Sequence, residues 1–124
     1  MDKPQFTCSV QTQFLPDRSQ LPDGPFGFAY TVSVVNTGNV TAQLMARHWV
    51  IADAHGNTEE VRGLAVVGHQ PVLKPGETFE YTSWVQLATP LGSMRGTFFC
   101  MTEDARPFDA EVPAFSLARP GALH

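Results

Sequence analysis

Residues 61–83 read VRGLAVVGHQPVLKPGETFEYTS, and this stretch decides the fold because it excludes one class of protein and indicates another. Gly63, Ala65 and Gly68 have the spacing of the pattern G-x-G-x-x-G, which binds pyrophosphate only where a strand enters it and a helix leaves it. Two prolines follow Gly68 within eight residues, and each lacks the backbone N–H that a helix needs. The stretch therefore predicts a loop, a Pro-Gly turn and a strand. A P-loop is excluded because no GK[ST] ending follows.

The composition of the 124-residue chain is that of a compact globular protein, with 43% hydrophobic and 16% charged residues. We expect a single domain over residues 1–124, with its core over about 6–118 and short flexible termini. Ten glycines and ten prolines favour a turn-rich β-protein. The formal net charge of −4 and the scattered Lys and Arg residues provide no basic stripe, so nucleic acid is not an expected partner.

The sequence shows no signal peptide and no apolar run near the roughly 20 residues that a membrane span requires. We therefore expect no membrane insertion and a cytoplasmic location. Cys8 and Cys100 lie in alternating apolar runs, which predicts buried thiols, with a cross-strand disulfide as the alternative in an exported protein.

Apolar and polar residues alternate with a period of two along most of the chain, which predicts strands. The expected strands are Phe6–Phe14, Phe26–Val35, Thr41–Asp53, Asn57–Val61, Glu77–Leu87, Gly92–Thr102 and Phe108–Leu117. The proline-rich segment 16–25 is expected to be a loop without a helix. About seven strands with regular turns predict an all-β, antiparallel two-sheet sandwich.

Large aromatic side chains supply the expected core, with Trp49 and Tyr81 as its anchors. The residues expected to pack around them are Phe28, Phe79, Phe98 and Phe115. Pro113 indicates that the last strand lies at a sheet edge or contains a bulge. Pairing of this edge with a second copy is discouraged by Pro113 and Asp109, so we expect a monomer or a weak homodimer.

Residues typical of catalysis are sparse, and we expect neither an enzyme nor a cofactor. No G-x-S-x-G motif is present, and both cysteines lie in apolar runs without a neighbouring base. Four side chains could gather near one end of the sandwich, namely His48, Asp53, His55 and His69. Because no H-x-H or C-x-x-C pair anchors them, no metal site is expected. His124 is terminal.

The best candidate for a functional site is the segment Arg62–Pro71 together with two residues of a neighbouring strand. Four consecutive apolar residues lie between its glycines, in a connection that should run over the surface. Either this loop folds down over the open end of the core, or it forms a surface that recognises a protein. Arg47 or Arg62 would then make bidentate contacts to a carboxylate or phosphate. The candidate binding residues are Arg47, His48, Arg62, Gly63, Ala65, Val66, Val67 and Gly68.

Spaced elements over nearly the whole chain, from about Thr7 to Pro120, resemble the ApaG family. They include Arg47-His48-Trp49, residues 53–56, 61–63, 66–68, 70–71, 74–76 and 79–83, Gly92, residues 94–96 and 113–115. The resemblance implies a fibronectin type III-like sandwich in a bacterial protein that is associated with cobalt tolerance and magnesium efflux, without a demonstrated enzymatic activity. It also implies a role in protein interaction, as inferred for related domains of eukaryotic F-box and polymerase-associated proteins. The family commonly has glycine at position 65, and Ala65 suits this loop only with a negative φ.

Two functions follow as hypotheses. The first is a non-enzymatic protein that binds an unidentified protein partner and influences divalent-cation homeostasis. The alternative is direct binding of a divalent cation or of a small molecule that carries a phosphate. Hydrolysis of a nucleotide has the least support, because the sequence shows neither a base nor a metal-binding carboxylate cluster.

Overall fold

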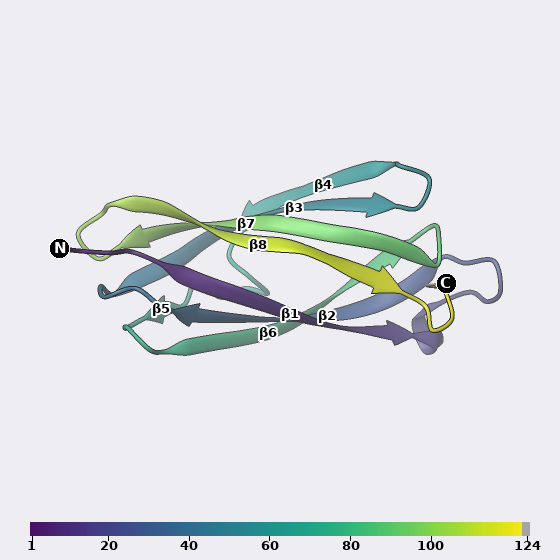
Figure 1. The fold of residues 1–124 in the computed structure, drawn as a ribbon, viewed down its shortest axis with the longest axis horizontal. Helices are drawn as coiled ribbons and strands as arrows, with labels where there is room; N and C mark the ends of the chain where they lie inside the picture. Colours follow the sequence, from purple (N-terminus) through teal and green to yellow (C-terminus); the bar gives the residue numbers. More distant parts are fainter. Residues whose placement is uncertain (123–124) are drawn as a thin grey trace.

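The computed structural model describes residues 1–122, which form two antiparallel layers of strands (Figure 1). The smaller sheet has the order β1-β2-β6, formed by β1 (Phe6–Leu15), β2 (Phe26–Asn36) and β6 (Thr78–Leu87). The larger sheet has the order β4-β3-β7-β8, formed by β3 (Ala42–Asp53), β4 (Thr58–Leu64), β7 (Leu91–Thr102) and β8 (Pro107–Ala118), with the short β5 (Val72–Leu73) beside β3. The predicted two-sheet antiparallel sandwich is confirmed. No helix within residues 1–122 is long and apolar enough to cross a membrane.

The core lies between the two sheets because alternate residues of each strand point inward. In β2 the inward set includes Phe28, Tyr30, Val32 and Val34, each less than 10% exposed. Trp49 of β3 is buried and makes edge-to-face contacts with Tyr30, at 5.6 Å between ring centroids, and with Phe98, at 5.8 Å. Tyr81 is buried beside Phe98. Both predicted aromatic anchors are therefore confirmed.

The last strand has both features that its proline predicted. β8 forms one edge of the larger sheet, and its register with β7 shifts between the pairs Met94–Phe115 and Gly96–Val112. The bulge contains Pro113 and Ala114 of β8. Because proline has no backbone N–H, the bulge leaves no ladder donor unpaired at Pro113.

Three details differ from the expectations. β4 continues to Leu64 because Leu64 pairs with Ala46, so the first three residues of the predicted loop belong to a strand. β5 is an additional strand, held by the pairs Ala42–Leu73 and Gln43–Val72. The loop after β1 begins with one turn of 3-10 helix (η1, Pro16–Arg18), since proline is tolerated at the first helical position.

Both cysteines are free thiols, and the predicted burial is complete for Cys100 only. Cys100 is fully buried and Cys8 is half-buried. Burial raises the pKa of Cys8 to about 11 and that of Cys100 to about 12. Both side chains therefore stay protonated near neutral pH and are poor nucleophiles.

Candidate functional site

Arg47 and His48 are neighbours on β3, but their side chains lie on opposite faces of the larger sheet. Because side chains alternate along a strand and Trp49 points into the core, His48 points to the outer face. Arg47 points inward, where it lines the space between the sheets. The candidate residues therefore divide into two sets, one on each face.

On the outer face, strand pairing brings two large apolar side chains to either side of a small one. Ala46 pairs with Leu64 of β4 on one side and with Phe99 of β7 on the other. Leu64 is 77% exposed and Phe99 is 41% exposed. Because Ala46 has only a methyl group, the row forms a hollow of about 580 Å³, which we call the outer notch. Its lining is Ala46, Arg47, His48, Arg62, Gly63, Leu64, Thr97, Phe99 and Asp109.

One side of the outer notch is polar. His48 Nε2 lies 2.7 Å from Glu60 Oε1, and Arg62 Nη2 lies 3.4 Å from the same oxygen. The hydrogen bond from His48 and then that from Arg62 hold the pKa of the Glu60 carboxyl below its usual range. Arg62 has three quarters of its side chain exposed and keeps other donors free for a partner's carboxylate.

A tight turn follows β4 and contains the apolar run of the predicted loop. Val66 and His69 exchange two backbone hydrogen bonds of 2.8 and 2.9 Å around Val67 and Gly68. Both of these central residues have positive φ, +48° and +79°, as a type I′ turn requires. Ala65 also has a positive φ of +68°, so the expectation of a negative φ there is wrong. Backbone N–H of Ala65 donates to Met45 O at 2.8 Å, which fixes this conformation.

The same turn divides its two valines between core and solvent. Val66 is fully buried, whereas Val67 is 55% exposed at the tip. The His69 ring lies 5.7 Å from that of Phe79, which belongs to the smaller sheet. The loop thus folds down over one end of the open side between β4 and β6, one of the two outcomes expected for it, and still presents Val67 to solvent.

Arg47 holds this loop by hydrogen bonds from the inner face of the sheet. Its Nη1 donates to the carbonyl oxygens of Leu64, at 2.9 Å, and of Ala65, at 3.0 Å. A Cβ at Gly63 would lie 2.8 Å from Nη1, so a larger residue there would displace the guanidinium from this position. Arg47 therefore holds the end of β4, and it lines both the space between the sheets and the outer notch.

The space between the sheets opens beside Arg47 into a second hollow, of about 940 Å³, which we call the inter-sheet cleft. It lies between β4 and β6, the edges of the two sheets, and its floor includes Tyr30 and Trp49. Segment 16–25 closes its other end, where the Arg18 guanidinium lies 4.7 Å above the Trp84 ring. The remaining lining includes Phe28, Val61, Ser83 and Val85, with Asp17 and Glu59.

The residues considered for a metal are not brought together. His48 lies on the outer face, Asp53 accepts hydrogen bonds from the backbone of His55 and Asn57 in its own turn, and His69 packs on Phe79. No group of three or more His, Cys, Asp or Glu side chains in the described part of the chain is placed to hold a metal ion. His124 lies outside the described residues.

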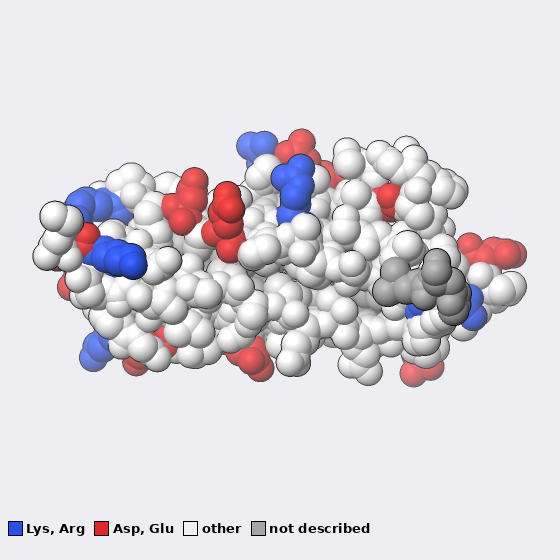
Figure 2. Space-filling view, viewed as in Figure 1, with Lys and Arg blue, Asp and Glu red and all other residues white. Residues whose placement is uncertain are grey.

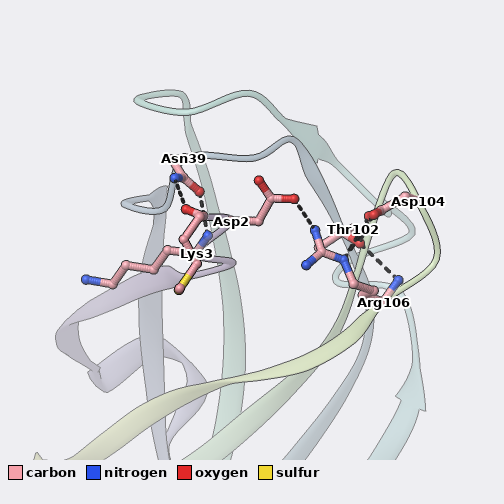
Figure 3. Close-up of polar contacts among 7 residues, drawn as sticks. Asp2, Lys3, Asn39, Thr102, Asp104 and Arg106 are labelled. Atoms are coloured by element: carbon pink, nitrogen blue, oxygen red, sulfur yellow. Dashed lines mark hydrogen bonds and ion pairs between the residues drawn. The ribbon is translucent and has the colours of Figure 1, made fainter.

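Two features of the surface were missed from the sequence. Phe99 joins the outer notch only through its pairing with Ala46, after a register shift between Leu44 and Ala46 that no sequence pattern shows. A polar cluster ties the N-terminal residues to two turns (Figure 3). In it, Arg106 donates to Asp2 and Asp104, and Asn39 bonds to the backbone of Met1 and Lys3.

Charged side chains are dispersed over the face drawn in Figure 2, where acidic groups lie among basic ones and no continuous basic stripe forms.

Comparison with known proteins gives a consistent family. The family model described as the ApaG domain matches residues 16–102. The protein named ApaG of Ralstonia nicotianae is 51% identical over 124 residues, covering 100% of both chains, and that of an Acidovorax species is 52% identical over 128 residues, covering 98% of this chain and 93% of its own. The crystal structure of a putative ApaA protein from Bordetella pertussis has a TM-score of 0.89 and 47% identity, covering 95% of this chain and 96% of that one. The resemblance found in the sequence is thereby confirmed.

Proposed function

Because the chain belongs to the ApaG family, we propose that it is a non-enzymatic interaction module, which binds a partner protein through the outer notch and takes part in divalent-cation homeostasis. The observation that carries the proposal is the exposure of Leu64 and Phe99 on either side of Ala46. Apolar side chains exposed together beside polar ones are typical of protein-recognition surfaces.

The polar rim would set the orientation of the partner. Arg62 and His48 lie along one side of the notch, and Asp109 pairs with Phe99 on the other. A partner segment with an apolar anchor and a carboxylate next to it would place the anchor over Ala46 and the carboxylate on Arg62. The turn that follows β4 also exposes Val67 near the same end of the strand. A β-branched residue with positive φ persists only where the surrounding structure imposes it, so the turn holds Val67 in this position.

The test is complementation of a strain that lacks the gene, with partner capture measured in parallel. We expect the double variant Leu64→Ser, Phe99→Thr to lose partner capture by about tenfold or more, since central apolar anchors dominate such interfaces. Cobalt tolerance should fall with it. Val72→Thr is the matched control, because Val72 is 58% exposed but lies outside the notch.

The control should behave as the parent protein in both measurements. Capture and tolerance that are unchanged in the double variant, with the fold verified by circular dichroism, would contradict the proposed surface. Loss of capture without loss of tolerance would retain the interaction and refute its link to cation homeostasis.

A further inference from the structure

The inter-sheet cleft has the form of a small-molecule site and is separate from the outer notch. Its volume of about 940 Å³ lies within the roughly 300–1,000 Å³ of ligand pockets. Half of its lining residues are aromatic or aliphatic, among them Phe28, Tyr30 and Val61, and polar groups supply the larger part of its exposed surface. Such pockets bind through an apolar body and a few polar groups at fixed positions.

One polar group of the cleft is a buried donor that lacks an acceptor. Trp49 is 2% exposed, and its Nε1 has no hydrogen-bond partner among the described residues. A Cβ at Gly96 of β7 would lie 2.5 Å from Trp49 Cε3, so the benzo edge of the indole covers β7. The edge that carries Nε1 is the opposite one, on the side of β4, where Nε1 is buried. An unpaired buried N–H is costly, and an oxygen that reached Nε1 from the cleft would satisfy it.

A cation lies beside this donor. Arg47 lines the cleft and uses only Nη1 in hydrogen bonds to the described residues, which leaves the donors of Nε and Nη2. No carboxylate in the described part of the chain forms an ion pair with it.

The acidic residues of the cleft stand away from this end. Glu59 pairs with Ile51, whereas Gly63, next to the Arg47 guanidinium, pairs with Arg47 itself. Four residues of extended strand separate the two positions, or about 13 Å. Asp17 belongs to η1 at the far end. The end of the cleft at Arg47 is therefore positive and rich in donors.

From this geometry we infer that the inter-sheet cleft binds a small molecule with an oxyanion, a carboxylate or a phosphate, attached to an apolar ring. The oxyanion accepts hydrogen bonds from Arg47 and from Trp49 Nε1, and the ring lies against Tyr30 and Val61. The inference does not depend on the proposed protein interaction, because Leu64 and Phe99 lie on the other face of the sheet.

The experiment follows the fluorescence of Trp49 in the Trp84→Phe variant, in which it is the remaining tryptophan. The probes are phenyl phosphate and benzoate, which separate the two oxyanions, inorganic phosphate, and benzyl alcohol as the uncharged control. We expect saturation by at least one ring-bearing oxyanion below about 1 mM, with benzyl alcohol weaker by about tenfold or more. Saturation by benzyl alcohol at the same concentration would overturn the inference, and so would no saturation by any probe up to about 10 mM.

Two variants place the binding in the cleft. Arg47→Gln removes the cation, and Ser83→Leu fills the cleft from the inner face of β6 while leaving Arg47 in place. Each should weaken binding by about tenfold or more, whereas Leu64→Ser on the outer face should leave it unchanged. Binding that survives Ser83→Leu in a folded protein would overturn the inference. If Arg47→Gln loses its near-ultraviolet circular dichroism, Ser83→Leu alone decides.

Discussion

The two faces of the larger sheet use the same strands for different purposes, and Arg47 and His48 show the difference. Adjacent in sequence, they lie on opposite sides of β3. His48 belongs to the exposed row of apolar and polar side chains around the outer notch, which solvent and a partner can reach. Arg47 lies on the same face as Trp49, and its hydrogen bonds hold the end of β4 and the loop that follows. A change on the inner face should therefore affect stability, whereas one on the outer face should affect recognition.

The largest loss of stability is expected where the largest buried side chain of the inner face is truncated. Trp49→Ala removes a buried indole that packs on Tyr30, Phe98 and Phe115 and should lower the free energy of unfolding by about 3–5 kcal/mol. Phe99→Ala, in the outer row, should cost no more than about 1 kcal/mol. Urea denaturation followed by far-ultraviolet circular dichroism measures both. Equal losses would mean that the outer row also belongs to the core.

A second pair makes the same comparison within one turn. Val66→Ser places a hydroxyl in a fully buried position and should lower the free energy of unfolding by about 2–3 kcal/mol. Val67→Ser, at the exposed tip, should change it by less than about 0.5 kcal/mol. Thermal and urea denaturation of the two variants provide the test, and a larger loss at Val67 would contradict this assignment of core and surface.

The strain at Val67 allows a change that stabilises the fold. Val67→Asn places a residue that tolerates positive φ before Gly68, which gives the favoured sequence of a type I′ turn. We expect a gain of about 1 kcal/mol, within the range for relief of backbone strain. Val72→Asn, in the exposed and extended β5, should give no gain. A decrease in the stability of Val67→Asn would show that the side chain of Val67 contributes more than its backbone costs.

The smallest effect is a pH dependence that arises from exposed carboxyls. Hydrogen bonds from His48 and Arg62 lower the pKa of Glu60, and those from Thr102 and Arg106 lower that of Asp104. A carboxyl whose pKa is lower in the folded than in the unfolded state stabilises the fold at pH values above its unfolded pKa. This contribution is lost as the pH falls through the folded pKa. Stability should therefore decrease as the pH falls below about 4.5.

The double variant Glu60→Gln, Asp104→Asn should show a shallower decrease over the same range, in urea denaturation at a series of pH values. An identical slope in parent and variant would assign the acid sensitivity to other groups.

Most of the architecture could be predicted from the sequence, because a period of two in hydrophobicity reports directly on a sheet with one buried face. The strands from Phe26 and from Glu77 were clear for this reason, and Pro113 marked both the edge and the bulge. β5 could not be predicted, since two residues carry no periodicity. For the candidate site, the sequence predicts which residues take part but not how they are arranged. The reason is that residues 62–71 contain both the end of a strand and a turn with positive φ at two non-glycine residues.

By itself, the sequence determined the fold class, the family and the identity of the aromatic core, because these depend on local alternation and on motifs spread along the chain. Only the tertiary structure decided which residues share a surface. Register placed Phe99 and Leu64 beside Ala46, and the Arg47 guanidinium fastened the loop that separates Val66 from Val67. The physical reason is that strand pairing and loop closure join residues far apart in sequence, and a single register shift changes every neighbour across the sheet.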